Sequence, residues 1–192
     1  LPERPPMFND VTTRDTAALL KLNAPEVANA TRLMLAARTD RGGVALSRGD
    51  VSAQETIYWA EPNLFDVLPL PVYRGDSRVA LARPDGIVLP RAMARKYFGR
   101  DDATGQVLRV NGHPMTVRAV IEDLPPDSTE LKSGIFASSL APFSAFATDP
   151  ADRLGGFHVT VGTYVRLKPG ADFAALERRL PKLVDGLTAG AN

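Results

Sequence analysis

Two aspartates on either side of a double proline are the residues whose type and spacing come closest to a catalytic arrangement. Asp123 and Asp127 enclose Leu124-Pro125-Pro126, and two carboxylates can share general acid and base work when their oxygens converge. The turn offers a second explanation, because aspartate side chains commonly hydrogen-bond the backbone of such turns. Ser128 and Lys132 add a weak serine–lysine spacing to the same stretch. The pattern favours a turn, and hydrolysis at Asp123, Asp127 or Ser128 is the alternative.

The amino-acid composition excludes several other kinds of catalytic and metal site. The 192 residues include no Cys and two His, which excludes thiol nucleophiles, disulfides, Cys-ligated zinc and a His-rich metal site. His113 and His158 are both predicted to be exposed to solvent. The sequence has no Gly-rich phosphate loop, no GxSxG elbow and no HExxH motif. We therefore predict no catalytic, cofactor-binding or metal-binding residues.

Charge and hydropathy narrow the class of protein. Lys and Arg total 23 against 22 Asp and Glu, a net charge of +1, which lacks the basic surface of a nucleic-acid-binding protein. Hydrophobic residues at 44% and charged residues at 23% are typical of a globular chain. The length predicts one domain or two small ones. No run of apolar residues is long enough to predict a membrane-spanning helix.

The most concentrated apolar patch lies in the proline-interrupted stretch 58–76. Trp59, Phe65 and Tyr73 stand there with Leu68 and Leu70. Two interpretations remain open: these side chains pack a junction between two subdomains, or they form a docking or substrate-contact surface. Trp59, Phe65 and Tyr73 are the candidate contact residues.

The elements that must position these residues are clearest between 85 and 124. Residues 87–89 predict a short strand, followed by a helix that Pro90 opens and Gly99 closes. Residues 107–121 predict a β-hairpin, because Asn111-Gly112 is a strong signal for a two-residue turn.

Elsewhere the patterns are less regular. Helices are predicted from Asp15 to Asn23, around 63–67, and from Asp172 onward, where Pro181 should kink or restart the helix. Strands are predicted over 31–37, 51–59 and 157–167. The stretch 128–156 has weak patterning. The mixture of strand–helix and strand–strand units predicts an α+β fold.

Several short motifs, taken in order along the chain, match one family. Residues 58–76 are YWAEPNLFDVLPLPVYRGD and residues 92–99 are AMARKYFG. Further matching runs are PEV at 25–27, TRL at 31–33, DATGQVL at 102–108, TVRAV at 116–120, EDLPPDS at 122–128 and TYVRLKPG at 163–170. Together they resemble MacB-like periplasmic core domains, the extracytoplasmic domains of FtsX/MacB-type ABC transporter permeases, over about residues 25–185. Ala119 departs from the family's usual glycine.

The resemblance implies a two-part α+β fold. A porter-like βαβ subdomain would be built from residues 1–83 and 130–192, and a small α/β (sabre-like) subdomain would be inserted at 84–129. In the family this domain lies between the first and second transmembrane helices. The chain is therefore expected to be a piece of a longer protein, with about 20 apolar residues before Leu1 and three spans after Asn192.

The resemblance also implies a function. It implies a non-catalytic domain at the periplasmic face of the bacterial inner membrane that transmits conformational change during ATP-driven export or mechanotransmission. ATP would be hydrolysed by a separate nucleotide-binding domain or subunit, so no cofactor is expected here. The expected partners are a second permease copy, the ABC ATPase, and a periplasmic adaptor or exported substrate. A ligand-sensing periplasmic module is the alternative, and a periplasmic hydrolase is a more distant one.

Overall fold

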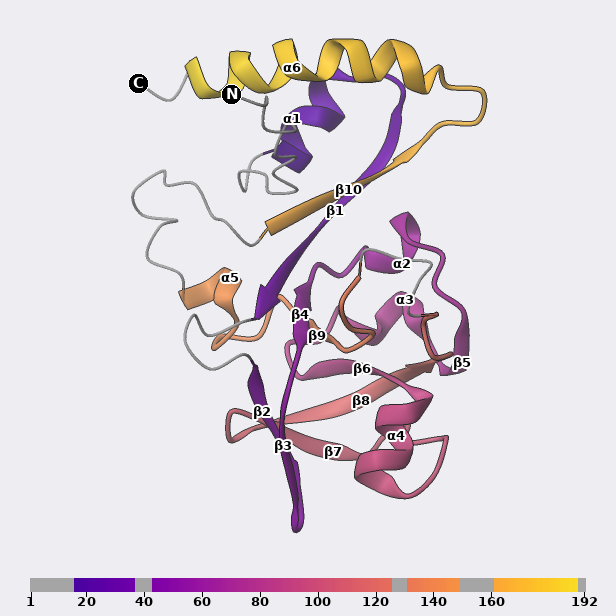
Figure 1. Ribbon diagram of the computed structural model, residues 1–192, viewed down its shortest axis with the longest axis vertical. Helices are drawn as coiled ribbons and strands as arrows, with labels where there is room; N and C mark the ends of the chain where they lie inside the picture. The colour runs from indigo at the N-terminus through magenta and orange to yellow at the C-terminus, as the bar shows by residue number, and fades with distance from the viewer. Residues whose placement is uncertain (1–15, 37–42, 126–130, 149–160, 190–192) are drawn as a thin grey trace, which may run out of the picture. The chain divides into compact units, whose positions relative to one another are not determined.

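The structure is a computed structural model that describes residues 16–36, 43–125, 131–148 and 161–189 (Figure 1). It divides into two compact units. The terminal unit comprises Leu1–Arg32 and Pro150–Asn192, and the central unit comprises Leu33–Asp149. Helices and strands mix in both, so the predicted α+β class is confirmed. The predicted separation of residues 84–129 as a subdomain is a different division and stays a prediction.

The terminal unit is built from both ends of the described chain. It contains α1 (Thr16–Asn23), the start of β1 (Val27–Ala36), β10 (Val161–Leu167) and α6 (Phe173–Ala189). Ala24, Val27 and Leu176 form its small core, against which Leu167 and Leu180 pack. An ion pair between Glu26 and Arg179 joins the residue before β1 to α6.

Helix α6 begins after Asp172, as predicted, and contains an internal proline. The N–H of Ala175 donates to Oδ1 of Asp172 at 2.9 Å, so Asp172 caps the helix as predicted. Phe173, the first residue of α6, is 60% exposed, and the buried face of the helix begins one turn later at Leu176. Pro181 was expected to kink or restart the helix. It does not restart it, because α6 continues through Pro181 as one helix, and the kink stays a prediction.

The central unit is a mixed sheet with short helices. Its strands follow the order β1-β4-β9-β6-β8-β7-β2-β3, and β5 pairs with β8 beside this path. The pairs β4–β9 and β6–β8 are parallel and the others are antiparallel. The strands are β2 (Val44–Arg48), β3 (Val51–Glu55), β4 (Ile57–Ala60), β5 (Val72–Gly75), β6 (Gly86–Pro90), β7 (Val107–Val110), β8 (His113–Ile121) and β9 (Phe136–Ser138). The helices are α2 (Leu64–Val67), α3 (Ser77–Ala80), α4 (Arg91–Phe98) and α5 (Ala145–Thr148).

The best-predicted part of the central unit is the run from β6 to β8. Helix α4 ends at Gly99, whose φ of 69° gives the left-handed cap that glycine adopts without strain. The β7–β8 turn has φ of 50° at Asn111 and 85° at Gly112, as the hairpin prediction requires. Asn111 also binds strand β2, because its N–H donates to the Ala45 carbonyl at 2.8 Å and its Oδ1 accepts from the Ala45 N–H at 3.1 Å.

Two sequence predictions were incomplete in this unit. The strand expected over 51–59 is divided at Thr56, because β3 pairs with β2 whereas β4 pairs with β1 and β9. Strand β9 lies inside the stretch with weak patterning. Its three residues are all buried between β4 and β6, so they show no alternation of polar and apolar side chains.

Candidate functional site

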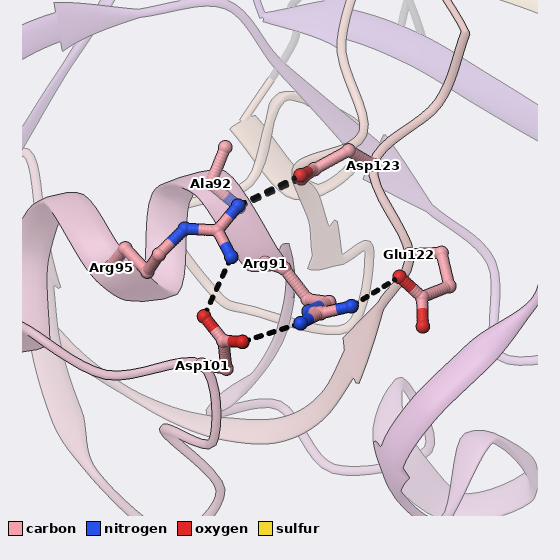
Figure 2. A network of polar contacts seen from close by, with 6 residues as sticks. All are labelled: Arg91, Ala92, Arg95, Asp101, Glu122 and Asp123. Atoms are coloured by element: carbon pink, nitrogen blue, oxygen red, sulfur yellow. Dashed lines mark hydrogen bonds and ion pairs between the residues drawn. The ribbon is translucent and has the colours of Figure 1, made fainter.

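Arg91, the first residue of α4, is the centre of a polar network in the central unit (Figure 2). Its Nη1 donates to Oε2 of Glu122 at 3.0 Å, and its Nη2 donates to Oδ2 of Asp101 at 2.5 Å. The guanidinium carbon lies 4.4 Å from the centre of the Tyr73 ring, within cation–π distance. Glu122 follows β8, Asp101 follows α4, and Tyr73 belongs to β5. One side chain therefore connects four segments of the chain.

Arg95, one helical turn after Arg91, extends the network. Its Nη1 donates to Oδ1 of Asp101 at 2.7 Å and its Nη2 donates to Oδ2 of Asp123 at 3.2 Å. The Asp101 carboxylate thus receives one arginine on each oxygen, as Figure 2 shows. The i,i+4 spacing places both guanidinium groups on the same face of α4.

Asp123 has a second role at the N-terminus of α4. The N-cap residue of this helix is Pro90, which makes no side-chain cap hydrogen bond. The N–H of Ala92 instead donates to Oδ1 of Asp123 at 2.7 Å. An acceptor that is distant in sequence therefore satisfies a first-turn N–H that is usually capped locally.

The electrostatics follow from these contacts. Hydrogen bonds from Arg91 and then Arg95 hold the pKa of Asp101 below its ordinary value. Hydrogen bonds to Asp101, first, and to Glu122, second, raise the pKa of Arg91. Each carboxylate of the network is occupied by an arginine or a backbone N–H. The arrangement is suited to holding elements together rather than to moving a proton.

A smaller polar cluster lies at the start of β6. Partial burial would raise the pKa of Asp85, but hydrogen bonds from Arg118 at 2.7 Å and Thr116 at 2.9 Å lower it overall. Arg118 and Thr116 belong to β8, so this cluster joins the loop before β6 to the neighbouring strand.

The three candidate contact residues lie in different surroundings. Trp59, in β4, is only 3% exposed, and its ring meets that of Phe143 edge-on with centroids 5.6 Å apart. Phe65, in α2, is half-buried. Tyr73, in β5, is half-buried between Arg91 and Arg74, whose guanidinium carbon lies 5.1 Å from its ring. Tyr73 therefore belongs to the network, and the contact role of all three residues stays a prediction.

The structure describes only some of the residues considered for catalysis. Asp123 binds α4, as above, whereas Asp127, Ser128 and His158 lie outside the described residues. His113 is exposed, as predicted, and its ring stacks on Phe143 at 4.0 Å.

Sequence reasoning missed Arg91, Asp101 and Glu122 as a group. The spacing of Arg91 and Arg95 was a usable signal, because it places two cations on one helical face. Their acidic partners were not predictable, since Glu122 is 31 residues from Arg91 along the chain.

The sequence matches one family model over most of its length. The family model described as the MacB-like periplasmic core domain matches residues 2–183. No curated protein is significantly similar in sequence. Among the described residues, no helix is both long enough and apolar enough to cross a membrane.

Three solved structures share the fold. One is a domain described as part of a permease from Porphyromonas gingivalis, 22% identical, covering 91% of this chain and 70% of its own, with a TM-score of 0.67. The periplasmic region of MacB from Actinobacillus actinomycetemcomitans is 15% identical and covers 92% and 75%, with a TM-score of 0.65. The extracellular domain of the noncanonic ABC-type transporter YknZ from Gram-positive bacteria is 14% identical and covers 94% and 86%, with a TM-score of 0.60.

Proposed function

The chain belongs to the family of MacB-like periplasmic core domains, and on this premise we propose that it transmits conformational change in an ATP-driven permease without catalysing a reaction. Its proposed place is the periplasmic face of a bacterial inner membrane. The work proposed is mechanical: movement that begins at the membrane is passed to a periplasmic substrate or partner.

The Arg91 network is the observation that supports this proposal. A domain that passes on movement needs segments that move as one body, because packed elements change position as rigid units. Arg91 joins α4, the loop at Asp101, the end of β8 and, through Tyr73, strand β5. Arg95 and Asp123 add a second connection between α4 and the segment after β8. These contacts couple segments whose backbones could otherwise shift separately.

The proposed partners follow from the family. A second copy of the permease would stand beside the first, and a separate ABC ATPase would bind and hydrolyse ATP. An adaptor protein or the exported substrate would contact the periplasmic surface. Tyr73 is the candidate contact residue best connected to the network, since its ring lies on Arg91.

The proposal can be tested by measuring movement in the full-length permease together with its ATPase. Because this chain has no Cys, Ala82→Cys at an exposed position gives it a single spin-label site once cysteines elsewhere in the protein have been replaced. Each of the two permease copies then carries one label. We expect the distribution of distances between these two labels to differ between the nucleotide-free and ATP-trapped states.

A variant of the network and a control variant separate the loss of the Arg91 contacts from the general effect of removing an arginine. Arg91→Ala should broaden the label distances in both states, because the segments lose their common partner. Arg78→Ala removes an exposed arginine of α3 whose guanidinium is outside the network, and it should leave the distances unchanged. Identical distributions in all nucleotide states, with ATP still hydrolysed, would reject the proposal.

A further inference from the structure

Strand β3 leaves one of its edges open in the part of the chain that the structure describes. It is the last strand in the order of the central unit and pairs with β2 alone. The pairing is regular from Val51 opposite Arg48 to Glu55 opposite Val44, so no bulge twists the edge away. Open edges are usually blunted by Lys, Pro or a bulge. The β3 sequence, Val-Ser-Ala-Gln-Glu, has no Lys and no Pro, and its one charged residue, Glu55, is bound to α4.

The β2–β3 hairpin is also held firmly in place. Oε1 of Glu55 accepts from Nζ of Lys96 at 2.5 Å and from the hydroxyl of Tyr97 at 2.8 Å. At the other end of the hairpin, Nη1 of Arg48 donates to the Tyr97 carbonyl at 3.1 Å. The Arg48 guanidinium also lies 4.5 Å from the centre of the Phe98 ring. Both ends of the hairpin are therefore bound to α4, and the open edge is ordered before anything binds it.

The free backbone groups of this edge can be assigned from the hairpin. Arg48 and Val51 flank a two-residue turn, and such flanking residues exchange hydrogen bonds with each other. The alternation of an antiparallel ladder then directs the N–H and C=O groups of Ser52 and Gln54 away from β2. Both residues are exposed.

We propose that this edge pairs with the same edge of a second copy of the chain, antiparallel and about a two-fold axis at Ala53. Ser52 of each copy then faces Gln54 of the other, and each of these two pairs exchanges two hydrogen bonds. Shifting the strands by one residue would pair outward groups with inward ones. Shifting the strands by two residues would leave only one of the two hydrogen-bonded pairs within β3. The centred register is the one that uses all the outward groups of β3.

Charge complementarity favours a second copy as the occupant. In the centred register Glu55 lies opposite Val51 of the other copy, whose neighbour on β2 is Arg48. The Glu55 carboxylate of one copy and the Arg48 guanidinium of the other thus lie on the same face of the joined sheet, the face that carries α4. Asp50 lies opposite Thr56, so no two acidic residues face each other. The small side chain of Ala53 meets itself at the axis, where non-hydrogen-bonded partners approach most closely.

The inference deepens the proposed function, because it names the surface by which two permease copies meet. Two short strands bury far less than the ~1,200–2,000 Å² of a stable complex. Pairing should therefore be weak for the free chain and strong only where the copies are held close together. Disulfide crosslinking can detect such weak contacts, because it captures the pair covalently when it forms.

The experiment uses the native absence of Cys. Ala53→Cys places two thiols opposite each other, with Cα atoms about 4.5 Å apart, within the range a disulfide bridges. Ser52→Cys and Gln54→Cys should each crosslink poorly alone, since like residues lie diagonally about 7–8 Å apart. Mixed together, these two variants should form a heterodimer. Ala82→Cys, more exposed than Ala53, controls for random collision.

We expect Ala53→Cys to crosslink about tenfold faster than Ala82→Cys under oxidised glutathione at high protein concentration. Adding Ser52→Pro removes an outward N–H, which an edge strand tolerates, and should lower the rate to that of Ala82→Cys without changing the melting temperature. Equal rates for Ala53→Cys and Ala82→Cys, or fastest crosslinking by Ser52→Cys or Gln54→Cys alone, would overturn the inference. These outcomes leave the label-distance test intact, because Ala82 reports movement wherever the copies meet.

Discussion

Replacing Asp123 tests whether a distant carboxylate caps α4. Asp123→Ala removes the acceptor of the Ala92 N–H and the partner of Arg95. Asp123→Asn keeps an acceptor oxygen and removes the charge. Since Asn caps helices about as well as Asp, the two variants separate the cap from the ion pair.

The magnitude follows from the geometry. Loss of an N-cap costs about 1 kcal/mol, within a range of 0.5–2. The Arg95–Asp123 pair is 49% and 45% exposed, so screening by water limits its contribution to about 0–0.5 kcal/mol. We expect Asp123→Ala to lower the free energy of unfolding by about 1–2 kcal/mol and Asp123→Asn by less than about 0.5. For a chain of this size each kcal/mol lowers the melting temperature by about 2–4 °C.

The assay combines urea unfolding at neutral pH with amide hydrogen exchange. Exchange should accelerate in the first turn of α4, at Ala92, in Asp123→Ala and remain slow in Asp123→Asn. Asp76→Ala removes the cap of the four-residue helix α3, and it should leave exchange in α4 unchanged. An Asp123→Asn variant as unstable as Asp123→Ala would refute the cap, because the charge alone would then account for the loss.

Two further predictions concern β5 and the acid response. Gly75→Ala should destabilise the central unit more than Gly99→Ala. Both glycines have positive φ, but a Cβ at Gly75 would lie 2.3 Å from the Arg118 carbonyl oxygen, whereas nothing lies within 4 Å of a Cβ at Gly99. Equal urea midpoints for the two variants would contradict this prediction. The lowered pKa of Asp101 means that its stabilising effect is full above the unfolded pKa, near 3.8, and is lost as the pH falls through the lower folded pKa. Asp101→Asn should therefore flatten the fall in stability below about pH 4, and an unchanged acid titration of stability would show that the network does not govern it.

How far the sequence predicted the fold depended on how local each signal was. Pro90, Gly99 and Asn111-Gly112 act through their own backbone preferences, so α4 and the β7–β8 hairpin were predicted close to their observed ends. Strand β9 was missed because three buried residues have no periodicity to detect.

The candidate site was less predictable for the same reason. The aromatic residues of 58–76 form one patch in the sequence, yet Trp59 is buried in β4 whereas Tyr73 lies on Arg91. The change from strand to helix to strand between them gives each side chain a different direction. Arg91 meets Glu122 only because α4 follows β6, which pairs in parallel with β8. Such contacts depend on the sheet order rather than on neighbouring residues.

Helix α4 connects the two surfaces on which the proposals depend. Its first half binds Asp101, Glu122 and Asp123 through Arg91, Arg95 and the Ala92 N–H. Its last turns bind the β2–β3 hairpin at both ends, and the hydroxyl and carbonyl of Tyr97 are the shared partners. Tyr97 is 2% exposed, so movement of the hairpin must either carry α4 with it or break these contacts. A displacement at the β3 edge thus has a continuous route to β8 through one helix, as the proposed transmission of movement requires.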